Sequence, residues 1–333
     1  MINSLLILLV IIFLQKIRPI RPFSHFNNLY LERSVSSAFK GVLALLVVLH
    51  HLAQRTNDVF LFHQFFRDNG YLFTGGFFFL SGYGLQKSYI TIPNYKKSFL
   101  IKRFSSVLFP YILVIGIYWI LKNDYTFYNV LKQLFENNTF VPFSWFIINI
   151  IYLYLIFYFT MSVSKKRKAL MIISTTLGTF LWIYICKKLI YGGWWYNTTF
   201  LFVFGIIWAS YEEKFLFCLK KYLAIILSIL MITLCFTYGT TMNEIKFLNA
   251  TIFVAMILIL SLKFRIGNNM LSFLGTISLE IYLLQGIFIE ITRQYIHNDS
   301  YWCCAVFILD IIGAYVLHMV IFKLKLLKQK ILN

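Results

Sequence analysis

The sequence has little charge and very few acidic residues. Charged residues make up 13% of the 333 positions, and Asp and Glu together number 12. A soluble domain has about 25% charged residues and roughly 45–50% apolar ones, whereas 60% of this chain is hydrophobic. These values exclude a soluble globular protein, a disordered chain and a collagen-like chain. They indicate an integral membrane protein with many spans.

Cysteine patterns that hold metals or staple small domains are missing too. The five cysteines form no CxxC pair, and neighbouring cysteines make poor disulfide geometry. We therefore expect neither a disulfide framework nor a metal site. These residues lie in or beside apolar runs, where they behave as small hydrophobic side chains: Cys186, Cys218, Cys235, Cys303 and Cys304.

Long apolar runs, in contrast, are abundant. A helix needs about 20 residues to cross ~30 Å of hydrocarbon. The shortest run lacks the basic start and the A-x-A cleavage site of a signal peptide, so we expect a helix there. Eleven candidate spans cover residues 3–15, 38–54, 70–86, 104–121, 143–161, 169–186, 197–210, 222–240, 247–262, 271–289 and 302–322.

The fold class that follows is all-α, a polytopic bundle of 10–11 transmembrane helices. We expect a single membrane domain over 1–333, because no connection is long enough to hold a domain with its own core. Within it, 1–32 supplies an extra N-terminal helix and a cytoplasmic linker, 33–322 the bundle, and 323–333 a basic cytoplasmic tail. Any chemistry must then take place inside the bundle or at its two mouths.

The basic residues are distributed unevenly between the two sides. The net charge is +19, which in a soluble protein would suggest nucleic acid as a partner. When successive loops are assigned alternately to the two sides of the membrane, 23 of the 31 Lys and Arg residues lie on one side and eight on the other. By the positive-inside rule the first side is cytoplasmic and includes the C-terminus. We expect no nucleic-acid binding and an external N-terminus, or an internal one if 3–15 does not span.

A few ionisable side chains lie at membrane depth, where they cost free energy and usually have a function. Glu280 and Asp310 are open to two interpretations, a functional group or a pairing group between helices. His50 and His51 lie deeper than Lys40, which marks the cytoplasmic edge. Eleven helical residues carry His51 about 16 Å inward, near mid-depth. A neutral imidazole there suits a general base.

Two further stretches have a composition that suits close packing or binding. Small residues recur over 75–84, which lets helices or a ligand approach closely. The basic stretch that includes Lys102 and Arg103 follows on the cytoplasmic side. It can anchor the chain or bind a phosphorylated ligand.

Four motifs, in order, resemble those of the acyltransferase-3 family of bacterial membrane acyltransferases. They match its Arg-x10-His, FFxxSGF/Y, basic-to-PPY and LGxISxxIYLxH elements, and they lie at 40–51, 77–83, 103–111 and 274–285. Trp145-Phe146 and Phe204-Gly205 are weaker similarities. This chain departs from the family pattern at Lys40 (for Arg), Gly75 (for an acidic residue), Ser106 (for Arg), Phe109 (for Pro) and Gln285 (for His).

The resemblance implies transfer of an acyl group, most often acetyl, from cytoplasmic acyl-CoA to a sugar hydroxyl. It implies His51 as the catalytic base, with His50 at a position that is usually apolar. No cofactor is expected to stay bound, and acetyl-CoA or another acyl-CoA is the co-substrate. Its phosphates are expected to meet Arg103, with Lys40 or Lys102 as further ligands.

The acceptor is expected to be a polysaccharide or a glycolipid precursor. The aromatic segment 192–197 suits a sugar platform, although an interfacial aromatic belt has the same composition. Candidates to orient the acceptor or the developing oxyanion are Ser81, Tyr83, Trp145, Asn149, Trp195, Asn197 and Glu280.

Two other functions remain open from the sequence. One is a transporter or flippase of lipid-linked glycan, although the chain shows no inverted repeat of the kind that marks many transporters. The other is a non-catalytic subunit of a polysaccharide synthesis or export complex. All three functions place the protein in the bacterial cytoplasmic membrane, in contact with lipid.

Overall fold

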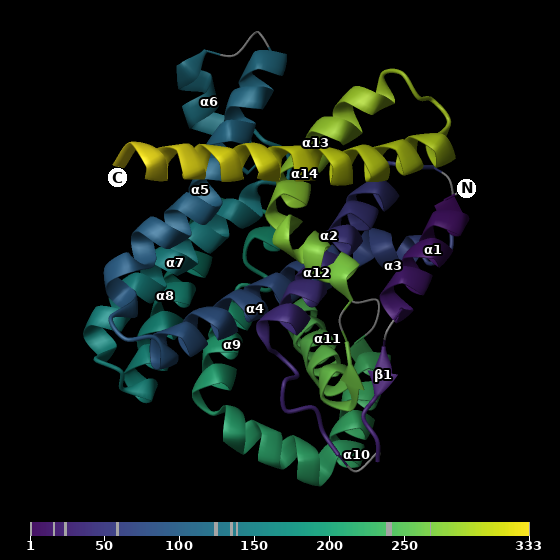
Figure 1. The fold of residues 1–333 in the computed structure, drawn as a ribbon. Coiled ribbons are helices and arrows are strands. Elements are labelled where there is room, and N and C mark those ends of the chain that lie inside the picture. The colour runs from purple at the N-terminus through teal and green to yellow at the C-terminus, as the bar shows by residue number, and fades with distance from the viewer. Residues whose placement is uncertain are drawn as a thin grey trace.

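The computed structural model describes residues 2–15, 17–22, 25–57, 60–122, 126–133, 136–137, 139–237, 242–266 and 268–332. Helices account for nearly all regular structure in these ranges (Figure 1). Their bounds are α1 Ile2–Leu14, α2 Arg33–Ala53, α3 His63–Asp68, α4 Gly70–Thr91, α5 Tyr95–Leu121, α6 Phe127–Gln133, α7 Trp145–Ser164, α8 Lys168–Lys188, α9 Phe200–Ser210, α10 Glu212–Thr237, α11 Asn243–Lys263, α12 Asn269–Thr276, α13 Ser278–Arg293 and α14 Asp299–Leu332, with a 3-10 turn η1 at Gly193–Trp195.

The predicted all-α polytopic class is confirmed, and each of the eleven apolar runs is mainly helical in the residues that the structure describes. Seven helices of the described chain are long and apolar enough to cross a membrane, or eight if the bent pair α12 and α13 is one span. This count is below the expected 10–11. Helices α1 and α9 have 13 and 11 residues, too few to cross about 30 Å of hydrocarbon. Helix α4 is long enough, but its glycines and polar residues lower its mean hydropathy.

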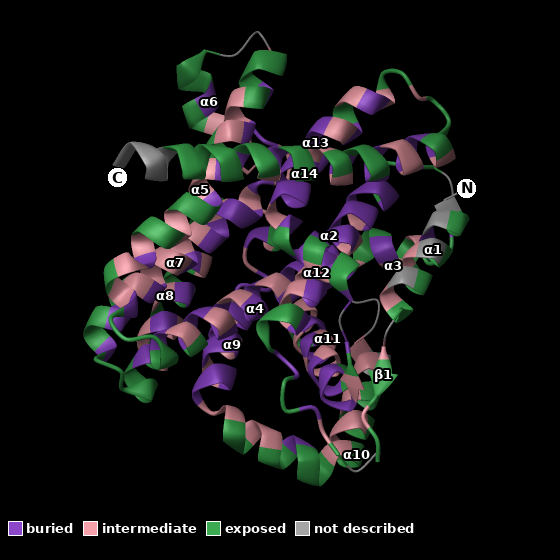
Figure 2. Ribbon diagram, viewed as in Figure 1, coloured by how far each residue is buried: buried purple, intermediate pink, exposed green. Residues whose placement is uncertain are grey.

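Helices α2 and α4 lie at the centre of the bundle. Figure 2 shows both largely buried, whereas α10 and α14 are mostly exposed. Helix α2 packs against α4, α12 and α13, and α4 packs against α9 and α11. Many apolar side chains of α10 and α14 are exposed, as expected for surfaces that face lipid. The two helices that contain the first two motifs are therefore shielded from lipid by the others.

Glycines allow two of these contacts to be made backbone to backbone. A Cβ on Gly82 of α4 would lie 2.0 Å from the carbonyl oxygen of Phe202 in α9. A Cβ on Gly275 of α12 would lie 1.8 Å from the carbonyl oxygen of Ser37 in α2. The small residues of the third predicted span therefore do bring helices together, as in other membrane bundles.

The segment 274–285 forms a broken helix. Helices α12 and α13 meet at Ile277 with a bend of 70°. The bend directs α13 along α2, where Gln285 is fully buried. This is how a residue 234 positions after His51 comes to contact it.

Both ends of the chain are helical. Helix α1 contacts α14, and the following linker adds a short strand, β1 (Arg18–Pro19), antiparallel to β2 (Phe264–Arg265). The segment expected as a basic tail, 323–333, continues α14 as far as Leu332. Lys328 and Lys330 of that tail have side chains outside the described set, as does Cys235, and the lysine at position 16 is outside it entirely.

Candidate active site

Three cavities follow one another through the bundle. The first, here called the large cavity, has a volume of about 940 Å³. The second, the narrow cavity, has about 120 Å³ and shares Lys40, Ser81 and Tyr154 with the first. The third, the histidine cavity, has about 450 Å³ and shares Thr74 and Tyr282 with the narrow one. Shared lining residues make the three spaces neighbours in a single series.

The order of the cavities is the same along each helix that lines them. On α2, Lys40 lines the large and narrow cavities and His51 lines the histidine cavity. On α4, Tyr71 lines the histidine cavity, Phe77 the narrow cavity and Lys87 the large one. Eleven residues of helix separate Lys40 from His51, or about 16 Å. The series therefore runs along the helix axes, from one end of the bundle toward the other.

Two hydrogen bonds fix the orientation of the His51 ring. Gln285 donates from Nε2 to the carbonyl oxygen of Tyr282 at 2.9 Å, which leaves its Oε1 as an acceptor. That oxygen lies 2.9 Å from Nδ1 of His51. Nδ1 therefore has the proton, and Nε2 keeps the lone pair that a general base requires. His51 and Gln285 are 6% and 0% exposed, so this arrangement is held inside the bundle.

Phe143 supports the same imidazole through its ring. The two rings stack with centroids 3.7 Å apart and an interplanar angle of 15°. Phe143 has a φ of +68°, an uncommon backbone conformation for a large side chain. Tyr282 donates a hydrogen bond to its carbonyl oxygen, which holds that conformation. Arg55 lies over the Phe143 ring as well, 4.7 Å from the centroid.

His50 also lines the histidine cavity but is held differently. Its Nδ1 lies 2.8 Å from the carbonyl oxygen of Phe66. Its ring occupies the space beside Gly70, where a Cβ would lie 2.3 Å from the ring. Both histidines therefore face one cavity, but only His51 is hydrogen-bonded to another side chain that orients it.

The rest of the histidine cavity is aromatic and amide-rich. Aromatic rings stack on sugars, and amides and hydroxyls bind sugar hydroxyl groups. The described lining contains one fully charged side chain, Arg55, and no carboxylate. Besides the histidines, the lining residues are Val47, Gln54, Arg55, Gly70, Tyr71, Thr74, Asn137, Thr139, Pro142, Phe143, Trp145, Trp194, Asn197 and Tyr282.

The structure brings only part of the predicted acceptor set to this cavity. Trp145 and Asn197 line it. Trp195 does not, because it is completely buried and donates from its indole to Asn137. Its neighbour Trp194 is 48% exposed and lines the cavity instead. The 3-10 turn η1 directs one of two consecutive tryptophans inward and the other outward.

Asn149, a predicted candidate to orient the acceptor or the oxyanion, does not line the histidine cavity. Its Nδ2 donates to the carbonyl oxygen of Trp195 at 2.6 Å. Its Oδ1 accepts from the indole of Trp182 at 2.7 Å. With both groups satisfied and no exposed surface, Asn149 fixes the aromatic segment against α7 and α8.

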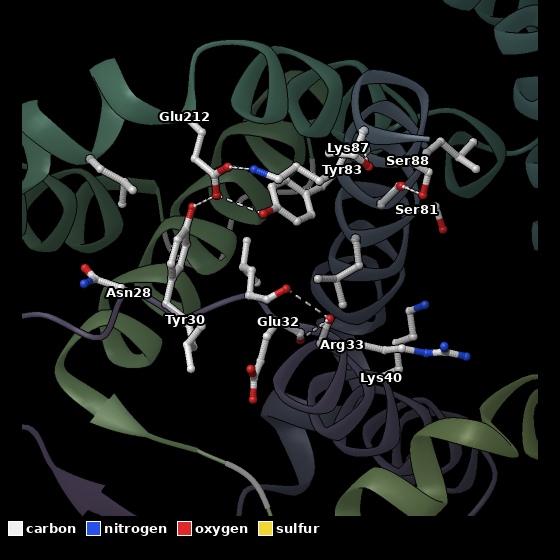
Figure 3. Close-up of a pocket in the computed structure, with 18 of the residues that line it drawn as sticks. Asn28, Tyr30, Glu32, Arg33, Lys40, Ser81, Tyr83, Lys87, Ser88 and Glu212 are labelled. Carbon is white, nitrogen blue, oxygen red and sulfur yellow. Dashed lines mark hydrogen bonds and ion pairs between the residues drawn. The ribbon is translucent and has the colours of Figure 1, made fainter. Parts of the chain in front are cut away.

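Tyr83 was also expected near His51, but it lies at the other end of the series. Its hydroxyl donates to Glu212 at 2.8 Å, in the wall of the large cavity. Tyr30 donates to the same carboxylate at 2.6 Å, and Lys87 pairs with it at 2.5 Å (Figure 3). Burial, followed by the Glu212 hydrogen bond, raises the pKa of Tyr30, so its hydroxyl remains a donor at neutral pH. Ser81 lines the large and narrow cavities, also away from His51.

The large cavity has a basic lining that only partly matches the predicted one. Lys40 and Arg103 line it, and Arg103 donates to the hydroxyl of Tyr95 at 2.8 Å. Lys102 is exposed on the outer side of α5 and does not reach the cavity, because the next residue on a helix points about 100° away. Three basic residues for which the sequence predicted no ligand contact also line it: Arg33, Lys87 and Lys220.

Glu280 and Asp310 lie outside these cavities. Glu280 accepts from Nδ1 of His318 at 2.8 Å, which pairs α13 with α14. Of the two interpretations given above, this contact favours Glu280 as a pairing group between helices. Glu280 lines none of the three cavities. Asp310 is 1% exposed, and neither carboxylate oxygen has a hydrogen-bond partner within the described structure.

Metal-ligating clusters and disulfides are not found in the described ranges. No group of three His, Cys, Asp or Glu side chains there is placed to hold a metal ion. Cys186, Cys218, Cys303 and Cys304 form no disulfide with one another.

The fold and the cavities define a class: a polytopic helical membrane protein with a polar cavity at each end of a narrow passage. A family model described as an acyltransferase domain matches residues 36–322. The chain therefore belongs to the acyltransferase-3 family, whose members are membrane acyltransferases. A comparison with curated proteins finds no match, and neither does a comparison with solved structures.

Proposed function

We propose that the protein is a membrane O-acyltransferase. It takes a short acyl group, acetyl being the one that the family resemblance implies, from acyl-CoA in the large cavity and places it on a glycan hydroxyl in the histidine cavity. The single observation that carries this proposal is the placement of His51, whose Nε2 keeps its lone pair, beyond a narrow passage from a basic cavity.

The large cavity suits the nucleotide end of coenzyme A. Its volume of about 940 Å³ is in the range of roughly 300–1,000 Å³ usual for ligand pockets. Arg33, Lys40 and Arg103 offer charge-assisted hydrogen bonds to phosphate oxygens. Arg103 is held in place by Tyr95, so its guanidinium is already positioned for this role.

The narrow cavity suits the pantetheine arm and the thioester. Apolar residues such as Val107, Phe146 and Ile150 form most of its lining. At about 120 Å³ it can hold a slender chain but not a sugar ring with its substituents. This size argues against passage of a glycan, and hence against the flippase alternative.

The reaction then needs one base and no external reagent. The acceptor hydroxyl gives its proton to Nε2 of His51 while its oxygen attacks the thioester carbonyl carbon. The new C–O bond forms the ester, the C–S bond breaks, and the proton passes from His51 to the departing sulfur. The products are the acylated glycan and coenzyme A.

The topology proposed with this reaction has the large cavity and the C-terminus on the cytoplasmic side of a bacterial cytoplasmic membrane. Acyl-CoA is then available where the large cavity opens. The acceptor is a polysaccharide or glycolipid precursor at the opposite surface, and synthesis or export machinery for that glycan is a partner of the same proposal. Membrane lipid surrounds the bundle.

His51→Ala should lower acyl transfer by about 10²- to 10⁴-fold, because the variant lacks the general base. Purified surface glycan from cells with the wild type, the variant or no protein is compared by mass spectrometry for base-labile acyl groups. His50→Ala is the matched control, because His50 lines the same cavity without a side-chain partner that orients it. Equal acylation in all three cell types contradicts the proposal. Loss of acylation only in the His50→Ala variant would identify His50, not His51, as the base.

A further inference from the structure

Arg55 is the one fully charged side chain among the described residues that line the histidine cavity. It follows His51 by one helical turn, just beyond the end of α2, and lies over the ring on which His51 stacks. Its charge is therefore placed beside the proposed reaction site. Among the described residues, none forms an ion pair or a hydrogen bond with its guanidinium.

The other basic residues predicted for the same side of the membrane are already engaged. Four of them pair with carboxylates, and three lie over tyrosine rings. The pairs are Arg67–Asp68, Lys122–Glu290, Lys132–Glu136 and Arg293–Asp299, and the ring contacts are Lys187–Tyr196, Lys188–Tyr184 and Lys246–Tyr71.

Arg55 differs from these seven residues because it lines the histidine cavity; like the three lysines, it lies over an aromatic ring rather than beside a carboxylate. Glu290 on α13 is near enough to attract it electrostatically, but that carboxylate pairs with Lys122 at 3.7 Å. The contact that the guanidinium makes in the described structure is with the Phe143 ring. Its charge thus faces a cavity whose described lining has no carboxylate to neutralise it.

We propose that the glycan acceptor carries an anionic group, a carboxylate or a phosphate, that Arg55 binds while the adjacent hydroxyl is held at His51. A guanidinium presents a rigid fork of donors that matches the two oxygens of either group. The ring of Phe143 positions that fork through a cation–π contact. The inference rests on the proposed function, and it names the class of acceptor: an acidic glycan.

The rest of the cavity fits a sugar that bears such a group. Trp145 and Trp194 offer faces to stack on a pyranose ring, and Asn197 has a buried amide oxygen with no partner in the described structure. The anionic group would then supply the negative charge that the described lining of the cavity lacks. A neutral sugar would leave Arg55 without a counter-charge at the partly enclosed mouth, which costs binding free energy.

The test measures binding separately from transfer. Protein purified into lipid nanodiscs is titrated by calorimetry, without acyl-CoA, with a neutral glucose trimer, the same trimer with one carboxylate, and the same trimer with one phosphate. We expect an anionic trimer to bind about 10- to 100-fold more tightly than the neutral one, as a charge-assisted bidentate contact provides. The tighter of the two anionic trimers distinguishes a carboxylate from a phosphate.

Substitutions assign the preference to the residue. Arg55→Gln should remove it, and Arg55→Lys should keep part of it because the charge remains without the fork. Arg67→Gln is the control, an arginine predicted for the same side that is paired with Asp68 and does not line the cavity. Equal binding of all three trimers, or a preference that survives Arg55→Gln, overturns the proposal.

Acyl transfer from acyl-CoA to the same trimers separates this inference from the proposed function. Arg55-dependent binding of an anionic trimer without transfer contradicts the acyltransferase mechanism and supports the acceptor class. Transfer to the neutral trimer as efficient as to the anionic ones supports the mechanism and rejects the acceptor class.

Discussion

Gln285 decides which ring nitrogen of His51 keeps its lone pair. It occupies the position at which the family motif ends in histidine, so the sequence marks it only as a departure. In the structure its amide is itself fixed by Tyr282, so it presents an oxygen rather than a nitrogen to the imidazole. An amide oxygen therefore accepts the hydrogen bond from His51 at the position where the family motif has a histidine.

Gln285→Met should lower kcat by up to about 100-fold, because the ring loses the partner that fixes its tautomer and orientation. The KM for acyl-CoA should stay within a factor of about two, since the large cavity is not altered. Gln285→His should keep most of the activity, because a ring nitrogen can accept the same hydrogen bond. Steady-state kinetics on the purified protein measure both constants, and a matching rise in KM would indicate a general packing defect instead.

Other residues of the site could not have been assigned from the sequence. Trp194 and Trp195 are adjacent and chemically identical, and only the turn that contains them puts one in the cavity and the other in the core. Arg55 was visible only as one more external charge. Its spacing of four from His51 was the available signal, but its orientation over Phe143 is a property of the folded molecule.

At the scale of elements, close contact between α4 and α9 is what sets the walls of the cavities. The two helices meet at Gly82 and Gly205, each of which lies against the backbone of the other helix. Side chains on the rest of α4 can then line all three cavities in order. The sequence indicated close approach in this span but not which helix approaches.

Gly82→Ala should destabilise the protein by about 1–3 kcal/mol, because a Cβ there would overlap the carbonyl oxygen of Phe202 and force the helices apart. Gly116→Ala is the matched control in α5. No described atom lies within 4 Å of the position that its Cβ would take, so the better helix propensity of alanine should leave stability unchanged or raise it by up to about 1 kcal/mol.

Thermal unfolding of both glycine variants in detergent, followed by fluorescence, gives the comparison. A melting temperature for Gly82→Ala equal to that of the wild type would mean that α4 and α9 can separate without cost. An equal loss in both variants would mean that glycine is needed for reasons other than the helix contact.

For the whole molecule, the proposed function requires that the two ends of the series of cavities open on opposite sides of the membrane. Lys87 lines the large cavity and Trp194 the histidine cavity, and both side chains are about half exposed. By the positive-inside rule we expect the first on the cytoplasmic side and the second outside.

A single cysteine in place of Trp194, in a background without the five native cysteines, should react with a membrane-impermeant maleimide in intact cells. A cysteine in place of Lys87 should react only after the cells are permeabilised. Gel shift of the labelled protein measures both. The same labelling pattern at both positions would contradict a passage between two sides of the membrane and would place both cavities at one surface.

The sequence by itself determined the class of the protein, because apolar runs of membrane length permit little other than helices. It also determined the approximate distance between Lys40 and His51, since a helix converts sequence separation directly into distance. Tertiary structure decided which side chains share a cavity with His51. That depends on the bend at Ile277, the turn at 193–195 and the glycine contacts of α4, and each brings together residues far apart in the chain. Such contacts leave no period or spacing in the sequence, and for this reason the contacts of Gln285 and Arg55 beside His51 emerged only from the folded molecule.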